Sequence, residues 1–318
     1  MRFAEAPVEP APVPREAAPW HGKSFRGPLF DLVEGVLARH PEYAPHRDGL
    51  LAHDAWYGFV DRAAEELCAA GVPAAEVRFA KRFPGAPERF VRAALARLVE
   101  AGVLHSGAYD AAAADAAAVS AARYEHGGLG TYIYPEEGRL LFALADLVRP
   151  AHAMFLGSYY GYWAAWAIPV IAARGGRVTL VDPDPDACAV ARRNFAPYGD
   201  AVRVVTATGQ AALAAGAEPI DLVAIDAELP RTHPDPDLRG KGVYRALLAA
   251  ALPHLAPTAY VVAHNILLAD ATGDAALAEV VARNAGELGP FLTLAARELD
   301  GFIELASTEG VGVGVRAR

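Results

Sequence analysis

Apolar residues in the first third of the chain recur every three or four positions, the spacing of one face of an α-helix. This pattern predicts helices over 29–37, 54–70 and 87–101. The last of these follows a short segment and a Pro84-Gly85 turn, which gives a helix-turn-helix over 74–104. Residues 108–122 are mostly alanine, the strongest helix former, and we interpret them as a helix or linker.

From about residue 138 the pattern changes to short apolar runs separated by helical stretches. The predicted strands are 153–156, 177–181, 202–205, 222–225 and 260–263. The predicted helices are 139–148, 163–174, 186–196, 209–215, 243–255 and 275–287. This alternation predicts an α/β fold with a doubly wound, mainly parallel sheet of seven strands. Two further runs, 291–296 and 302–307, flank Asp300-Gly301 and predict an antiparallel C-terminal hairpin.

A length of 318 residues suggests two domains. We predict a disordered Pro-rich tail at 1–19, a smaller helical N-terminal domain and linker at 20–122, and a ligand-binding domain at 123–318. With 53% hydrophobic residues the chain can bury a substantial core.

Charge and cysteine content narrow the class of protein. The net charge of −9 lacks the electrostatic signature of a nucleic-acid binder. Two cysteines cannot make a disulfide framework, and no secretory signal is visible, so we expect a cytoplasmic location. The longest apolar run, Trp163 to Ala173, is too short to span a bilayer, so we expect no membrane association.

In an open α/β sheet, ligands bind beyond the carboxyl ends of the strands. The residues found there are Gly157, Ser158, Tyr159, Gly161 and Tyr162; Asp182 and Pro183; Thr208, Gly209 and Gln210; Asp226; and His264 and Asn265. The glycine loop misses the G-x-G-x-x-G dinucleotide fingerprint. Asp182 can accept two hydrogen bonds from a ribose diol; its other role would be a helix N-cap, for which Asp186 is better placed. Gln210 can pair with a base edge.

These strand-end segments together resemble class I S-adenosylmethionine (SAM) dependent methyltransferases, specifically the catechol and caffeoyl-CoA O-methyltransferase-like group. The resemblance runs from about residue 130 to the end of the chain. It implies a Rossmann-like methyltransferase fold in which the loop from Gly157 cradles the methionine and ribose of SAM. It also implies that Asp182 holds the ribose and that Gly209-Gln210 contact the adenine. The helix-turn-helix resembles a winged-helix-like dimerisation module, which indicates a homodimer.

Three positions depart from the family pattern. Phe155 stands where strand one usually carries an acid, Leu229 where metal-dependent members carry a base lysine, and His264 where they carry aspartate. Two alternatives follow. Either Asp226, His264 and Asn265 bind a divalent metal, or the site is metal-free and His264 acts as a base. His233 is a second candidate base. A neutral His264 would lose activity at low pH as it protonates near 6.5.

Tyrosines are dense around the first strand. A tyrosine face within about 6 Å of a sulfonium stabilises the cation by roughly 0.5–2 kcal/mol. We predict that Tyr159, with either Tyr132 or Tyr134, forms this wall, and we count Tyr159 among the catalytic candidates.

The predicted function is methylation of an oxygen or nitrogen of a small molecule, in secondary metabolism, with SAM as cofactor. In the alternative, the SAM aminobutyrate chain itself reacts, by cyclisation or transfer, and releases methylthioadenosine. A third hypothesis is a regulator that binds DNA through the helix-turn-helix. The local net charge of +3 over Glu76–Glu100 is small for that role, and we expect no nucleic-acid binding.

Overall fold

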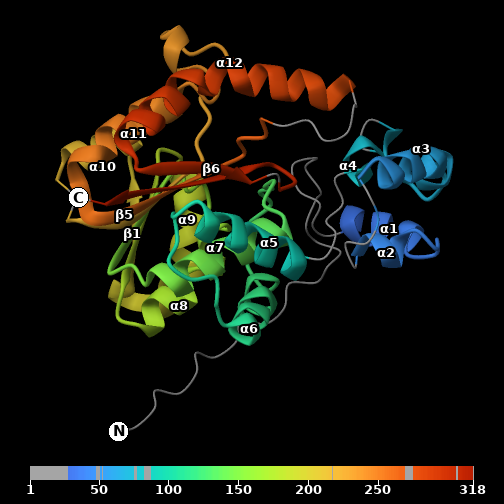
Figure 1. The fold of residues 1–318 in the computed structure, drawn as a ribbon, viewed down its shortest axis with the longest axis horizontal. Coiled ribbons are helices and arrows are strands. Elements are labelled where there is room, and N and C mark those ends of the chain that lie inside the picture. Colours follow the sequence, from blue (N-terminus) through green and yellow to red (C-terminus); the bar gives the residue numbers. More distant parts are fainter. Residues whose placement is uncertain are drawn as a thin grey trace, which may run out of the picture.

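Figure 1 shows the computed structural model of the chain. The structure describes residues 28–47, 51, 53–74, 77–81, 87–216, 218–268, 275–305 and 307–317. The predicted tail at 1–19 and the Pro84-Gly85 turn lie outside the described residues.

A seven-stranded sheet forms the centre of the described chain, with strand order β3-β2-β1-β4-β5-β7-β6. The strands are β1 (His152–Leu156), β2 (Arg177–Asp182), β3 (Val202–Thr206), β4 (Ile220–Ile225), β5 (Leu255–His264), β6 (Gly301–Leu305) and β7 (Val311–Ala317). The first five are parallel, and β7 pairs antiparallel with β5 and β6. The predicted fold class is confirmed. The order reverses between β1 and β4, so a ligand crevice is expected at their carboxyl ends.

Each central strand is buried on both faces because its alternate side chains enter two different cores. Ala153 and Phe155 of β1 pack on one side of the sheet, and Met154 and Leu156 pack on the other. Helices α5 (Pro87–Glu100), α7 (Pro135–Val148), α8 (Ile168–Ala173) and α9 (Pro185–Phe195) cover the first side. Helices α10 (Gly209–Ala214), α11 (Val243–Ala251) and α12 (Ala275–Glu298) cover the second. Short 3₁₀ turns join them at η3 (Ala164–Trp166), η4 (Ala196–Ala201), η5 (Pro236–Leu238) and η6 (Leu252–His254).

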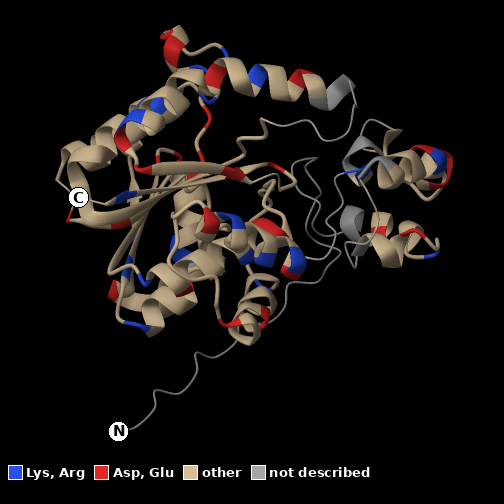
Figure 2. Cartoon of the chain, in the orientation of Figure 1, with Lys and Arg blue, Asp and Glu red and all other residues tan. Residues whose placement is uncertain are grey.

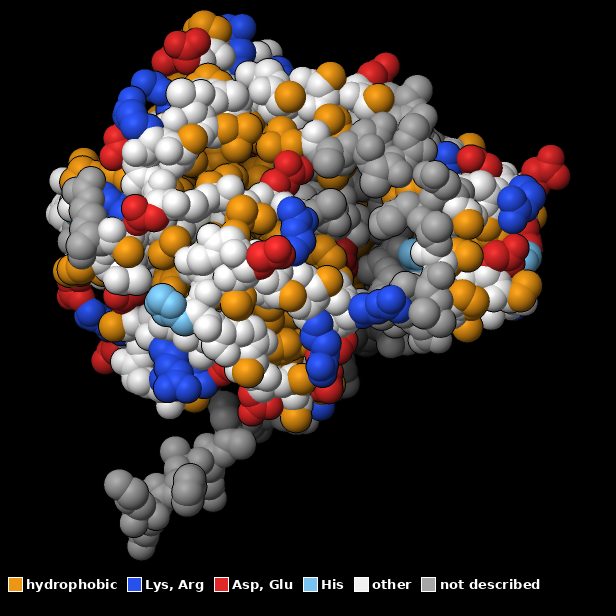
Figure 3. Space-filling view, in the orientation of Figure 1, with side chains coloured by type: hydrophobic (Ala, Val, Ile, Leu, Met, Phe, Trp, Pro, Cys, Tyr) orange, Lys and Arg blue, Asp and Glu red, His pale blue; other side chains and the backbone are white. Residues whose placement is uncertain are grey.

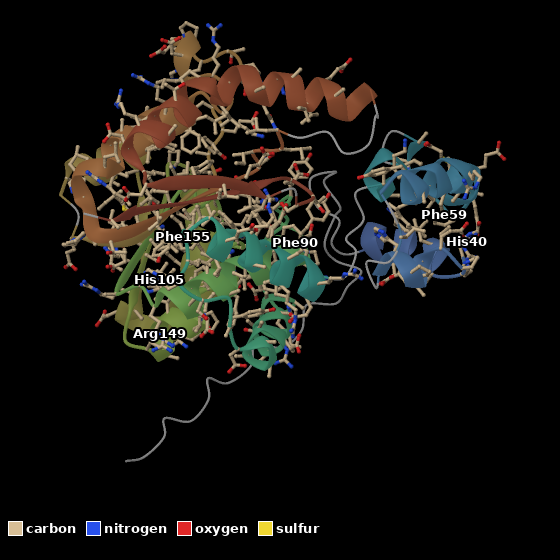
Figure 4. All side chains as sticks on the ribbon, viewed as in Figure 1. His40, Phe59, Phe90, His105, Arg149 and Phe155 are labelled. Atoms are coloured by element: carbon tan, nitrogen blue, oxygen red, sulfur yellow. The ribbon has the colours of Figure 1, made fainter. Side chains whose placement is uncertain are left out.

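Helices α1 (Pro28–Leu37), α2 (Tyr43–Arg47), α3 (His53–Ala69) and α4 (Val77–Lys81) have a hydrophobic cluster of their own. They lie to one side of the sheet in Figure 1, and Figure 4 marks His40 and Phe59 within them, with ring centroids 5.1 Å apart. In contrast, α5 contributes Val91, Leu95 and Leu98 to the core that also contains β1 and β2.

The predicted linker is a helix, α6 (Ala111–Ala121), capped by Asp110 and packed on α7. Apart from Tyr132 and Tyr134, which pack with α1–α4, hydrophobic packing therefore divides the described chain between α4 and α5. The domain boundary at 122 stays a prediction that nothing in this packing marks.

The C-terminal hairpin exists, but its predicted position is wrong. Its arms are β6 and β7, whereas 291–296 continues α12 to Glu298. Pro290 lies inside that helix, and the apolar run after it supplies the helix face with Phe291, Leu294 and Ala295. Asp300-Gly301 is the turn from α12 into β6. A short apolar run has no period that separates a strand from a buried helix.

Charged residues of both signs are distributed over the helices (Figure 2). On the face shown in Figure 3, basic and acidic side chains alternate with apolar ones. No helix in the described part of the chain is long and apolar enough to cross a membrane.

Candidate functional site

The loop after β1 is held tightly against β2 and β4. The backbone N–H groups of Gly157 and Ser158 both donate to the carbonyl of Val181, each at 3.0 Å. Gly157 has a φ of 77°, and a Cβ there would lie 2.5 Å from the carbonyl oxygen of Asp226. Only glycine fits this close approach without strain. The loop therefore lies at the reversal of strand order.

Asp182 ends β2 with its carboxylate turned toward this loop. Its Oδ2 accepts a 2.7 Å hydrogen bond from the backbone N–H of Tyr159, which has a φ of 49°. Its Oδ1 accepts from the N–H of Asp184 at 2.9 Å. Burial raises the pKa of Asp182, the two N–H donors lower it, and Asp226 raises it further. Each oxygen keeps lone-pair capacity for a ligand hydroxyl. The N-cap of α9 is Asp184, not Asp186, because Asp184 accepts from the N–H groups of residues 186 and 187.

The other cofactor candidates divide between exposed and packed positions. Thr208 caps α10 by accepting from Ala211 N–H, and Pro183 is exposed beside Asp182. Gly209 is buried where a Cβ would strike Leu247, and Gln210 is half-buried. Gly161 has a φ of 83° and packs near Phe195. The Tyr162 side chain is 2% exposed, among Tyr124 and His126, so it belongs to the core and not to a ligand surface.

A small hollow lies at the carboxyl ends of β1 and β4. Its polar lining comes from Ser158 and Asp226, and Phe155 and Trp163 form its aromatic wall. The hydroxyl of Ser158 is buried and has no hydrogen-bond partner among the residues that the structure describes. Buried polar groups are rarely left unpaired, so this hydroxyl is available to a ligand.

His264 lies at the far end of the site with a carboxylate beside each ring nitrogen. Its Nε2 is 3.0 Å from Oε2 of Glu137, and its Nδ1 is 3.3 Å from Oδ2 of Asp226. The second contact is an ion pair without the alignment of a hydrogen bond. The side chains of His264 and Glu137 are 1% and 0% exposed, whereas that of Asp226 is 31% exposed.

The surroundings of His264 do not favour the neutral base with a pKa near 6.5 that the sequence predicts. Burial by itself lowers the pKa of His264, but Asp226 and Glu137 raise it to about 10. The two carboxylates thus favour the imidazolium form, which has no lone pair for a substrate proton. A role of His264 as a neutral base stays a prediction that this environment does not favour.

Glu137 is the residue of this cluster that sequence reasoning missed. Its Oε2 accepts from Tyr134 N–H at 3.0 Å as well as facing His264, and its Oε1 accepts from Ser307 Oγ at 2.7 Å and Glu309 N–H at 2.6 Å. The available signal was Pro135-Glu136-Glu137, an acidic first turn that usually faces solvent. Its partners are up to 172 residues away, which no local pattern reveals.

Glu136 is a second buried acid beside it. Its Oε1 accepts from the backbone N–H and hydroxyl of Thr308, while its Oε2 is buried with no hydrogen-bond partner in the described part of the chain. Burial, reinforced by Glu137, raises the pKa of Glu136 to about 7. This carboxyl therefore titrates in the neutral range.

Asn265 does not join His264 and Asp226 as a metal ligand. Its side-chain oxygen accepts a 2.7 Å hydrogen bond from Lys241 Nζ, which also donates to the Asn265 carbonyl and to Asn284. Both nitrogens of His264 face carboxylates. Among the described residues, no three His, Cys, Asp or Glu side chains are grouped to hold a metal ion. The donor set does not fit a divalent cation.

Lys241 lies near the position of the missing family lysine. Leu229 and Gly240 exchange two backbone hydrogen bonds of 3.0 Å, which places Lys241 beside Leu229 across the loop. Lys241 is 5% exposed, and burial lowers its pKa. Its three acceptors occupy its three N–H groups, so it holds Asn265, whose φ is 56°.

The candidate base His233 and two of the three candidate wall tyrosines lie in surroundings other than those expected from the sequence. The hydrogen bonds of the His233 ring go to the backbone of Asp235, two residues away. Tyr132 and Tyr134 pack in the hydrophobic cluster of α1–α4, whereas Tyr159 is half-buried near Asp182 and Asp184. The sulfonium wall stays a prediction for Tyr159.

Residues 154–266 match the family model described as a methyltransferase domain. Over these residues the match confirms the methyltransferase resemblance inferred from sequence.

The chain is also similar to a curated methyltransferase and to solved methyltransferase structures. Catechol O-methyltransferase of Niastella koreensis is 33% identical over 115 residues, which are 33% of this chain and 50% of that protein. The chain thus spans about half the length of the curated relative. A Geobacter sulfurreducens methyltransferase structure is 23% identical over 64% of this chain and 89% of its own, with a TM-score of 0.47. A Streptomyces achromogenes O-methyltransferase involved in tomaymycin synthesis, solved with SAM, is 20% identical over 65% and 90%, with a TM-score of 0.47.

Proposed function

We propose that the chain transfers the methyl group of SAM to an oxygen or nitrogen of a small molecule. The observation that carries this proposal is the Asp182 carboxylate, fixed by two backbone N–H donors beside the glycine loop of a methyltransferase domain. The ribose diol would donate to Asp182. The unpaired Ser158 hydroxyl and the Asp226 carboxylate would meet the methionine side of SAM across the hollow.

The chemistry is an in-line displacement. The acceptor atom attacks the methyl carbon, the carbon–sulfur bond breaks, and S-adenosylhomocysteine leaves with the electron pair on sulfur. Alignment of the two reactants lowers most of the barrier. Asp226 is the partly exposed carboxylate of the cluster, and we assign it the hydrogen bond from the acceptor's O–H or N–H group and the uptake of the proton that this group loses on methylation.

The test is calorimetry of SAM binding to wild type and Asp182→Ala. Two charge-assisted hydrogen bonds, each about 1.5–3 kcal/mol, predict a loss of affinity of about tenfold or more. Asp186→Ala, an exposed acid four residues away, is the matched control and should leave affinity unchanged. Equal SAM affinity in a folded Asp182→Ala protein would disprove the assignment.

Product identity separates methyl transfer from reaction of the aminobutyrate chain. Methyl transfer yields S-adenosylhomocysteine, and the alternative yields methylthioadenosine. The methyltransferase relatives favour the first. Chromatography of the nucleoside released from SAM with a panel of phenols and amines gives the answer.

We further propose a cytoplasmic homodimer with a biosynthetic role, in which the helices before residue 123 cover the site or form the dimer contact. Cys68 and Cys188 are free thiols, which suits a reducing compartment. Val99 on α5 and Val119 on α6 are exposed large hydrophobic side chains that suit a contact. Light scattering after size exclusion of wild type and Val119→Asp tests the dimer.

A further inference from the structure

We call the end of the site at Asp226, His264 and Asn265 the acceptor edge, because the methyl acceptor would bind there. The positive charge of this edge comes from the side chains of His264 and Lys241. We propose that Glu137, His264 and Asp226 form a buried carboxylate–imidazolium–carboxylate bridge, which stands where metal-dependent methyltransferases bind a divalent cation and makes this site metal-independent. This inference rests on the proposed function, because it concerns the acceptor side of the same site.

The geometry of His264 carries the first part of the argument. Carboxylate oxygens lie 3.0 Å from Nε2 and 3.3 Å from Nδ1, so each ring nitrogen faces a carboxylate, and a doubly protonated ring is the form that both carboxylates stabilise. An imidazolium has no lone pair for a metal. The Trp163 ring, with its centroid 4.8 Å from that of His264, packs against the imidazole, and the side chain is 1% exposed.

The residues next to the bridge, Asn265 and Lys241, also disfavour a metal ion. Asn265 has its amide oxygen on the ammonium of Lys241, and Lys241 is fixed in turn by Asn284 and by its backbone N–H on Glu287. A divalent ion at this edge would displace that hydrogen bond and meet two resident cations. The edge thus has neither a free amide oxygen nor a free imidazole nitrogen to offer.

The bridge also joins three elements of the fold. Glu137 is in the first turn of α7, His264 ends β5, and Asp226 follows β4. Of the three, Asp226 reaches the hollow. Glu137 is therefore a positioning residue that acts on the substrate side through His264, by fixing the orientation of the Asp226 carboxylate.

Two measurements on wild type test the bridge without an acceptor substrate. Titration with MnCl₂ after EDTA treatment should give no binding up to about 1 mM, and SAM affinity should be the same with and without EDTA. In protein labelled with ¹⁵N-histidine at pH 7.5, one ring should have both nitrogens protonated, and this signal should disappear in His264→Gln. A micromolar Mn²⁺ site, or a His264 ring with one protonated nitrogen, would overturn the proposal.

A variant sharpens the test. His264→Asp places a third carboxylate between Glu137 and Asp226, and oxygen ligands suit Mn²⁺, so Mn²⁺ affinity should rise at least tenfold. His105→Asp, on an exposed loop after α5 (labelled in Figure 4), should bind no Mn²⁺. Equal Mn²⁺ behaviour of the two folded variants would contradict the role given to His264. If His264→Asp does not fold, the ¹⁵N signal of wild type still decides.

Failure of this inference differs visibly from failure of the proposed function. A chain that binds no SAM but shows the doubly protonated ring and no Mn²⁺ site would retain the bridge and lose the methyltransferase assignment. A chain that binds both SAM and Mn²⁺ would keep the methyltransferase assignment and lose the bridge.

Discussion

The proposed site has a cofactor edge around Asp182 and an acceptor edge around His264, and the contacts that fix these two edges differ in sequence range. At the cofactor edge, Asp182 is satisfied by the backbone of Tyr159 and Asp184, which follow neighbouring strand ends. At the acceptor edge, Glu137 binds side chains and backbone from β5 and from the turn between β6 and β7, 127 to 172 residues away. The first edge depends on local loop geometry, whereas the second requires the whole sheet to be assembled. The acceptor edge should therefore be the part whose variants affect folding most.

The largest effect is expected for Glu137→Ala. The substitution leaves the N–H groups of Tyr134 and Glu309, the Ser307 hydroxyl and the His264 imidazolium without their acceptor. Breaking a buried ion pair costs about 3–5 kcal/mol, and the lost hydrogen bonds add to this. We expect the free energy of unfolding to fall by about 4 kcal/mol or more in urea titrations.

Glu100→Ala, an exposed acid at the end of α5, should change the free energy of unfolding by about 0.5 kcal/mol at most. If Glu137→Ala were equally harmless, the contrast between the two edges would be lost.

The next largest effect is the pH dependence that Glu136 gives to the free energy of unfolding. Its pKa is about 7 in the folded chain against an ordinary 4.5, so the folded state keeps a proton that the unfolded state has lost. The free energy of unfolding should therefore fall as pH rises from about 4.5 to 7, by roughly 3 kcal/mol at about 1.36 kcal/mol per pKa unit.

Glu136→Gln should abolish this slope, because an amide has the same shape and does not titrate. Urea titrations of wild type and variant at pH 5 and 7.5 measure it, and comparing the two proteins removes the contribution of His264. Parallel pH curves for the two proteins would show that Glu136 is not the titrating group.

The sequence could predict the sheet and the residues at its strand ends because both follow from local patterns. Apolar runs located the five parallel strands, and their ends located Asp182 and Asp226. The pattern failed at 291–296, where a helix face was taken for a strand. It also failed at His264: its type and position were visible, but its charge depends on Glu137, whose approach is set by the packing of α7 on the sheet.

A smaller effect is expected for Gly157→Ala at the junction of the two edges. The φ of 77° and the 2.5 Å approach to the Asp226 carbonyl both oppose a Cβ. Unfolding experiments should show a loss of about 1–3 kcal/mol. Gly175→Ala has a similar φ of 77° but open space around its Cβ, so it isolates the backbone strain from the collision. If the two variants lose the same stability, the close approach of β1 and β4 is not what requires Gly157.

The smallest effect is expected for Ser158→Ala, which should change SAM affinity without lowering the free energy of unfolding. Ser158 has a buried hydroxyl without a partner among the described residues, so Ser158→Ala removes an unsatisfied group and should leave stability unchanged or slightly higher. If that hydroxyl binds SAM, affinity should fall by about two- to tenfold, the value of one hydrogen bond of roughly 0.5–1.5 kcal/mol. Calorimetry with SAM and urea unfolding on the same protein measure both quantities, with Ser120→Ala at an exposed position of α6 as control. A variant that loses stability but keeps SAM affinity would assign the hydroxyl to the fold. The cofactor edge would then depend, like the acceptor edge, on internal polar contacts.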